Sequence, residues 1–214
     1  MRFAELAALA KKGEITTPSG DVVCPSRLRA LGELLGASGG AEKLHYLLEY
    51  SHTSRAFRHD LAELLPYGGR NPLYAVIHES SYADGVVTDW SAARMLPDDF
   101  REDPTLLTGE HVMPEWFDTD QELRPWKEVA NLMANHPWPK LYDPDVLRTA
   151  EVPCAAAVYH DDAYVPRKFS LETAALLPQM HAWVTTEYEH NGSNASGGAV
   201  LDRLIKLANG EIVR

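Results

Sequence analysis

Acidic residues and histidines gather at two places in the last third of the sequence. His160, Asp161 and Asp162 follow one short apolar run, and the stretch from Glu187 to His190 follows another. A carboxylate that orients a histidine, and a histidine that acts as a general base, are two of the three parts of a nucleophilic triad. Asp162 and His190 are therefore the candidate acid and base.

The third part of such a triad, the nucleophile, has one sequence candidate. The stretch 36–40 reads GASGG and matches the pattern GxSxG around Ser38. That pattern makes an exposed nucleophile only on a sharp turn between a strand and a helix. Ser38 lies between two segments with helical periodicity, so we interpret it as part of a glycine-rich turn. Ser193 and Ser196 lack the same context, no glycine-rich oxyanion loop is present, and we expect the nucleophile to lie outside this chain.

Other kinds of site are weakly supported by the residue types. The acids and histidines near 160 and 190 could ligate zinc, but they lack the helical spacing of zinc hydrolases, so we expect no metal. The net charge is −11 and no basic cluster occurs, which argues against nucleic-acid binding. Cys24 and Cys154 lie far apart without a CxxC pattern and are expected to be free thiols.

The elements that must position these residues fall into two groups. Before residue 150 the apolar spacing predicts helices only, whereas the last 65 residues alternate strand and helix. The predicted helices cover 27–35 (capped by Ser26), 41–50, 55–65, a segment beginning at Asn71-Pro72, 90–96 and 122–135. Strands are predicted at 152–159 and 182–186, both buried, with helices at 170–177 (capped by Ser170) and 198–209.

This alternation predicts an α/β fold with a parallel sheet. Two strands are too few for such a sheet, so we expect a helical region at 1–150 joined to the last part of a sheet at 151–214. Functional residues in open parallel sheets lie beyond the carboxyl ends of the strands, where Asp162 and His190 are found. The order acid then histidine, with the nucleophile upstream, is that of α/β hydrolases.

Several segments together resemble one peptidase family. They are LRALGELLG at 28–36, EKLHYLLE at 42–49, NPLYAVIHES at 71–80, LLTGEH at 106–111, residues 152–165 and WVTTEYEHNG at 183–192. These segments are similar to the C-terminal half of prolyl aminopeptidases, also called proline iminopeptidases, which are serine peptidases of the α/β-hydrolase fold. The resemblance covers most of the chain and implies an incomplete α/β-hydrolase fold, with a helical cap followed by the last βαβα units.

The resemblance also implies roles for individual residues. Asp162 would be the triad acid, in agreement with a proline four positions later at Pro166, and Asp161 ranks second. His190 would be the base. Glu79 and Glu110 lie in matching segments and would bind the free amino terminus of the substrate. The family's oxyanion loop and GxSxG serine, which belong to its upstream half, are absent here.

The function implied is release of N-terminal proline from peptides by a Ser-His-Asp mechanism that needs no cofactor. Three alternatives stay open: an inactive fragment, a subunit that needs a separate N-terminal half, and another capped α/β hydrolase such as an esterase or epoxide hydrolase. No long apolar stretch and no secretory signal are found, so we expect no membrane partner and a cytoplasmic location. An incomplete sheet would expose an unpaired apolar edge, so the isolated chain is expected to self-associate.

Overall fold

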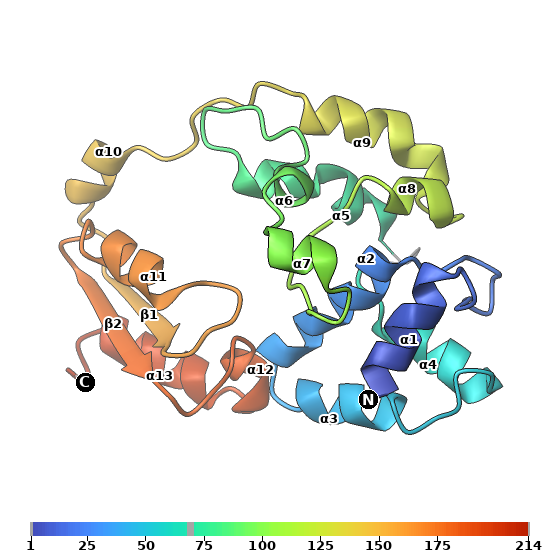
Figure 1. The fold of residues 1–214 in the computed structure, drawn as a ribbon. Helices are drawn as coiled ribbons and strands as arrows, with labels where there is room; N and C mark the ends of the chain where they lie inside the picture. The colour runs from blue at the N-terminus through green and yellow to red at the C-terminus, as the bar shows by residue number, and fades with distance from the viewer. Residues whose placement is uncertain (1, 68–70, 214) are drawn as a thin grey trace. The chain divides into compact units, whose positions relative to one another are not determined.

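The computed structural model describes residues 2–67 and 71–213, which form two compact units (Figure 1). The helical unit comprises Met1–Leu34 and Ala41–Leu141. The sheet unit comprises Leu35–Gly40 and Tyr142–Arg214. The chain therefore leaves the helical unit for six residues and returns to it. The roles expected for 1–150 as a cap and 151–214 as part of a hydrolase core stay predictions.

Short helices make up the helical unit. The helix predicted at 55–65 and the start of the helix predicted at Asn71-Pro72 agree closely with the structure, and the other helices agree less closely. In chain order the helices are α1 (Arg2–Lys11), α2 (Pro25–Arg29), η1 (Ala30–Gly36), α3 (Gly40–Leu47), α4 (Arg55–Leu64), α5 (Pro72–Ile77), η2 (His78–Tyr82), α6 (Ser91–Arg94), α7 (Asp98–Glu102), α8 (Trp116–Thr119), η3 (Arg124–Trp126) and α9 (Lys127–Ala134).

The helix predicted at 27–35 differs in its start and in its type. It begins two residues earlier, with Cys24 as N-cap and Pro25 in the first turn, and it continues as the 3-10 helix η1. Proline is favoured at this position because its fixed φ suits the helix and its missing N–H is not needed there. The prediction of Ser26 as the cap was wrong, because its hydroxyl instead donates to Glu115 Oε1 at 2.5 Å.

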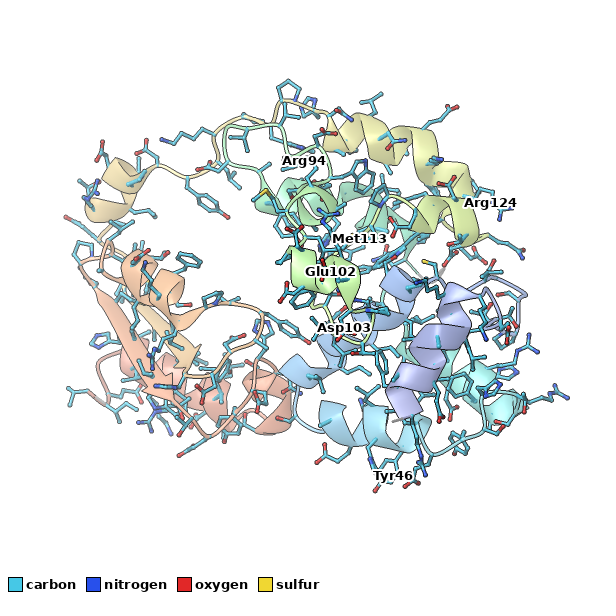
Figure 2. All side chains as sticks on the ribbon, in the orientation of Figure 1. Tyr46, Arg94, Glu102, Asp103, Met113 and Arg124 are labelled. Atoms are coloured by element: carbon cyan, nitrogen blue, oxygen red, sulfur yellow. The ribbon has the colours of Figure 1, made fainter. Side chains whose placement is uncertain are left out.

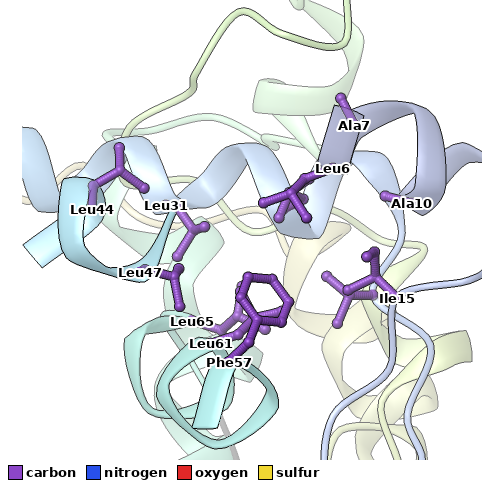
Figure 3. Packing of buried hydrophobic residues seen from close by; sticks show 12 residues of the cluster. Leu6, Ala7, Ala10, Ile15, Leu31, Leu44, Leu47, Phe57, Leu61 and Leu65 are labelled. Carbon is purple, nitrogen blue, oxygen red and sulfur yellow. The ribbon is translucent and has the colours of Figure 1, made fainter. Parts of the chain in front are cut away.

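Two apolar clusters form the core of the helical unit. The first joins α1, α2, η1, α3 and α4 through fully buried side chains that include Leu28, Leu31, Phe57 and Leu61 (Figure 3). The second surrounds Trp116 and the neighbouring Phe117, and also contains buried residues of α5 and α9. The helices that contribute to these clusters do so through their apolar faces, as amphipathic periodicity requires.

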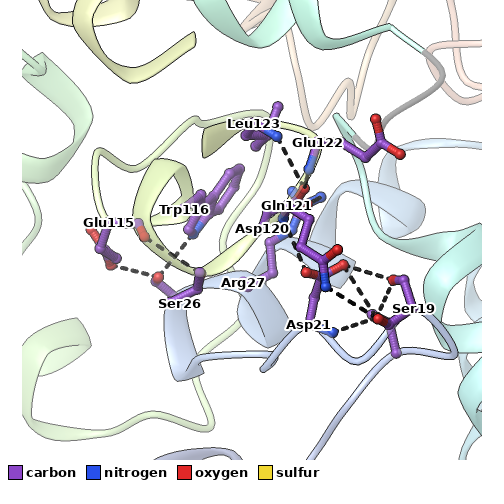
Figure 4. Close-up of polar contacts among 12 residues, drawn as sticks. Ser19, Asp21, Ser26, Arg27, Glu115, Trp116, Asp120, Gln121, Glu122 and Leu123 are labelled. Carbon is purple, nitrogen blue, oxygen red and sulfur yellow. Dashed lines mark hydrogen bonds and ion pairs between the residues drawn. The ribbon is translucent and has the colours of Figure 1, made fainter. Parts of the chain in front are cut away.

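Polar contacts connect the loops of the helical unit to its helices. Arg27 is buried, lies 3.6 Å from Asp120 and places its guanidinium over the ring of Trp116 (Figure 4). Arg94 donates to the carbonyl oxygens of Thr88 and Asp89 at 2.7 and 2.8 Å, which ties α6 to the loop before it (Figure 2). The buried guanidinium group of Arg27 is tolerated because the Asp120 carboxylate and the Trp116 ring replace water around it, whereas Arg94 is exposed.

The sheet unit contains two parallel strands and four helices among its described residues. Strands β1 (Cys154–Tyr159) and β2 (Met180–Thr185) pair from Cys154↔Met180 to Tyr159↔Thr185. Helix α11 (Arg167–Ala174) connects them, α10 (Pro144–Arg148) precedes them, and α12 (Gly192–Ala195) and α13 (Ala199–Ala208) follow. A mixed α/β fold with a parallel sheet was predicted and is confirmed. The cap at Ser170 was wrong, because α11 begins directly after Pro166.

The two strands are less covered than predicted. Only Val158 and Tyr159 of β1 and Thr185 of β2 are buried, and Val184 is 42% exposed. Parallel strands become buried when helices cover both faces and further strands flank them. The described sheet has two strands, so much of its apolar surface stays in contact with solvent.

No helix in the described parts of the chain is long and apolar enough to span a membrane. Cys24 and Cys154 are both free, as the sequence predicted.

Candidate functional site

The structure brings Asp162 and His190 together at the carboxyl ends of the two strands. Asp162 lies in the turn that follows β1, and His190 lies in the loop that follows β2. His190 Nδ1 is 3.0 Å from Asp162 Oδ2 and 3.2 Å from Oδ1. Because the strands are parallel and in register at Tyr159 and Thr185, their following loops meet at one edge of the sheet.

The turn itself holds the Asp162 carboxylate in place. Its Oδ1 accepts hydrogen bonds from the backbone amides of Tyr164 at 2.8 Å and Val165 at 3.0 Å. Burial raises the pKa of Asp162, but the hydrogen bonds from the Val165 amide, His190 and the Tyr164 amide outweigh it and lower the pKa below its ordinary value. Asp162 is therefore ionised at neutral pH.

An ionised Asp162 fixes the position of the proton on His190. A carboxylate can only accept hydrogen bonds, so Nδ1 of the imidazole must donate. In the neutral ring this leaves the Nε2 lone pair free to take a proton. The His190 side chain is 43% exposed whereas that of Asp162 is 7% exposed, so the imidazole is accessible and the carboxylate is shielded. This arrangement can perform general base catalysis.

The neighbouring Asp161 has a different partner. Its Oδ1 lies 2.9 Å from Nδ1 of His160, and its side chain is 83% exposed. The geometry therefore pairs Asp162, and not Asp161, with His190.

Ser38 lies in a turn between η1 and α3, as the sequence predicted, and residues 2–37 contain no strand that leads into it. Its backbone amide donates to Asn191 Oδ1 at 2.9 Å. This is a helix–helix turn and not the strand–turn–helix geometry that exposes a nucleophilic serine.

Glu79 and Glu110 lie in the helical unit, in one cluster with aromatic residues. The Tyr82 hydroxyl donates to the Glu110 carbonyl oxygen at 2.6 Å, so it accepts from Nε2 of His78 at 2.8 Å. Glu110 Oε1 accepts a hydrogen bond from the Tyr74 hydroxyl at 2.9 Å. The electrostatic fields of Glu79 and Glu110 both act on Tyr82, whose pKa is raised, first by burial and then by these two carboxylates.

Glu79 is almost completely buried, with 1% of its surface exposed. Its Oε2 accepts from the Ser91 amide at 3.1 Å, whereas its Oε1 has no hydrogen-bond partner among the described residues. A buried carboxylate oxygen without a donor costs about 1–3 kcal/mol. Glu79 Oε1 can therefore accept a hydrogen bond from a donor that carries positive charge.

A third carboxyl group joins this cluster, and the sequence analysis missed it. Burial first, and then the field of Glu110, raise the pKa of Glu33 to about 7, while Arg27 opposes the rise. The signal in the sequence was an acid inside the apolar run LGELLG. Helical periodicity assigns that run to the core and does not single out the acid within it.

Aromatic rings complete the surroundings of these carboxyl groups. Tyr67 stacks on Tyr74 with ring centroids 5.5 Å apart, and it also lies 5.1 Å from the His78 ring and 6.2 Å from that of Trp116. Burial lowers the pKa of His78, an effect that Glu110 partly offsets. The cluster thus combines carboxylates with flat apolar faces, a composition that suits a cation with an attached hydrocarbon ring.

Among residues 2–67 and 71–213, no group of three or more histidine, cysteine or acidic side chains is placed to hold a metal ion. The expectation of a reaction without metal or cofactor stays a prediction.

Comparison with curated proteins gives relatives of one kind. The chain is 38% identical over 216 residues to the proline iminopeptidase of Aeromonas sobria, in a match that covers 94% of this chain and 50% of the relative. It is 24% identical over 224 residues to proline iminopeptidase aneH of Aspergillus aculeatus, covering 99% of this chain and again 50% of the relative. No family model matches the chain.

These matches confirm the resemblance to proline iminopeptidases that the sequence indicated. The chain spans about half the length of the curated relatives it matches, which is consistent with a likeness to their C-terminal half.

Proposed function

We propose that this chain supplies the base, the acid and the amine-binding carboxylates of a serine hydrolase that releases N-terminal proline from peptides. The observation that carries the proposal is the Asp162–His190 pair at the carboxyl ends of two adjacent parallel strands. The relatives named proline iminopeptidases support the class of reaction. The serine and the oxyanion hole would lie outside these 214 residues, in a part that would complete an α/β-hydrolase sheet.

Within this proposal, His190 transfers the proton and Asp162 orients the His190 imidazole. Nε2 of His190 takes the proton of the serine hydroxyl as the serine oxygen attacks the carbonyl carbon of the substrate's first residue. The proton then passes to the leaving amine, and Asp162 stabilises the imidazolium meanwhile. Water, activated by the same histidine, releases the acyl group as free proline.

The carboxylates of the helical unit would bind the substrate's free amino terminus. The protonated secondary amine of an N-terminal proline has two N–H donors and one positive charge. Glu79 Oε1 is buried and has no donor among the described residues, so it can accept one of them, and Glu110 would accept the second. Removing this amine from water is favourable only where such carboxylates face it. A helical cap that presents them would restrict the enzyme to free amino termini.

The test is reconstitution. The 214-residue chain is co-expressed with the half of the Aeromonas sobria relative that it does not match, and hydrolysis of proline arylamide is measured. We expect hydrolysis that His190→Ala abolishes, because the general base is lost. His160→Ala removes the other histidine of the same edge and is the matched control, which should leave hydrolysis unchanged.

Two results would argue for the alternatives. A complex that forms without any hydrolysis would support an inactive fragment. Ester hydrolysis without proline-arylamide hydrolysis would support another capped α/β hydrolase.

A further inference from the structure

A six-residue segment between two helices of the helical unit packs with the sheet unit instead. This segment, Leu35–Gly40, lies against the loop that carries His190. The backbone amide of His190 donates to the Gly36 carbonyl oxygen at 3.1 Å. The backbone amide of Ser38 donates to Asn191 Oδ1 at 2.9 Å. Two consecutive residues of the histidine loop are therefore tied to a segment more than 150 positions earlier in the chain.

An aromatic ring fills the space between this segment and the imidazole. The ring of Tyr164 meets the ring of His190 edge to face, with centroids 4.8 Å apart and planes at 75°. On its other side it lies so close to Gly36 that a Cβ atom there would stand 2.4 Å from Tyr164 Cζ. Any residue larger than glycine at position 36 must therefore displace the Tyr164 ring.

The opposite end of the histidine loop is confined in a similar way. A Cβ atom at Gly192 would stand 2.4 Å from the Tyr159 hydroxyl oxygen, and Tyr159 is the last residue of β1. The loop thus passes closely over the strand that leads to Asp162.

We infer that the segment Leu35–Gly40, together with Tyr164, positions His190 toward Asp162. The imidazole is 43% exposed, so only contacts on its covered side can hold its orientation. Asp162 fixes one nitrogen, the Gly36 carbonyl oxygen fixes the backbone, and the Tyr164 ring limits rotation about the side-chain bonds. Ser38 takes part through its backbone amide and not through its hydroxyl. This inference rests on the proposed function for its catalytic meaning, but its geometry can be tested separately.

The experiment uses the full chain labelled with ¹⁵N. Long-range ¹H–¹⁵N spectra show which imidazole nitrogen carries the proton, and His190→Gln identifies the signals. We expect His190 to be protonated on Nδ1 in the unchanged chain. Gly36→Ala should abolish this preference, because its methyl group displaces the Tyr164 ring.

The matched control is Gly109→Ala. This is the same substitution at a glycine that has nothing within 4 Å of the added Cβ, and it should leave the His190 signals unchanged. Tyr164→Ala should lose the Nδ1 preference, and Tyr164→Phe, which keeps the ring, should retain it. A Gly36→Ala chain that stays folded and keeps the unchanged His190 signals would overturn the inference.

Two further results bear on the positioning of His190. If Gly36→Ala does not fold, Asn191→Ala removes only the hydrogen bond from the Ser38 amide, and unchanged His190 signals in that variant would overturn the inference. If the signals change as expected but the reconstituted complex hydrolyses nothing, the positioning stands and the proposed function fails.

Discussion

Replacing Asp162 with Asn exchanges one carboxylate oxygen for an NH₂ group at the atom that contacts His190. The structure determines which oxygen is exchanged. Oδ1 accepts from the amides of Tyr164 and Val165, so the carbonyl oxygen of an asparagine must take that place. Its NH₂ group then occupies the place of Oδ2, 3.0 Å from His190 Nδ1.

An NH₂ group can only donate, so Nδ1 of His190 must become the acceptor and the ring proton must move to Nε2. Nε2 is the atom that would take the serine proton, and in this tautomer it has no free lone pair. The same exchange in serine-protease triads lowers kcat about 10⁴-fold. This corresponds to about 5 kcal/mol of transition-state stabilisation.

The assay has two parts. Proline-arylamide hydrolysis by the reconstituted complex should fall by about 10⁴ in Asp162→Asn, and ¹⁵N spectra of the chain alone should show the proton on Nε2. Asp161→Asn is the matched control, because Asp161 pairs with His160 and should change neither reading. An Asp162→Asn chain that keeps the proton on Nδ1, or a complex that keeps its activity, would refute the reasoning.

Further predictions concern both units. Glu79→Gln in the reconstituted complex should raise KM for proline arylamide at least tenfold, with ester hydrolysis retained; equal loss of both would contradict amine binding. Burial raises the pKa of Glu33 to about 7, so the folded chain binds more protons than the unfolded chain between pH 4.5 and about 7. The free energy of unfolding should therefore fall as the pH rises through that range. Denaturant titrations of Glu33→Gln should lack this decline, and an unchanged decline in that variant would refute the prediction. The isolated chain should self-associate in sedimentation velocity, and Val184→Lys on β2 should reduce this; a monodisperse chain that melts cooperatively would contradict the exposed sheet edge.

Much of the fold was predictable because its elements have clear periodicity. The small apolar run before Asp162 and the run before His190 predicted two parallel strands, and the sheet joins them in that way. Helix starts were less predictable. Pro25 and Pro166 both determine where a helix begins, whereas the hydroxyl residues expected as caps, Ser26 and Ser170, do not.

The candidate site was predictable where it depends on neighbours in sequence, and not where it depends on distant ones. Asp162 follows its strand by three residues, and the turn hydrogen bonds that select it over Asp161 are local. The contact of Gly36 with His190 joins residues far apart in sequence, and no local pattern indicates it. Glu33 was missed because its raised pKa comes from burial and from Glu110, which a helical pattern alone does not reveal.

The central claim is that this chain provides the acid and base for a serine outside it. The most direct measurement incubates the reconstituted complex with a fluorophosphonate probe and determines the intact mass of each chain. We expect one adduct on the added N-terminal half, lost in His190→Ala, and no adduct on the 214-residue chain. An adduct on this chain that maps to Ser38, or labelling of the added half that does not depend on His190, would contradict it.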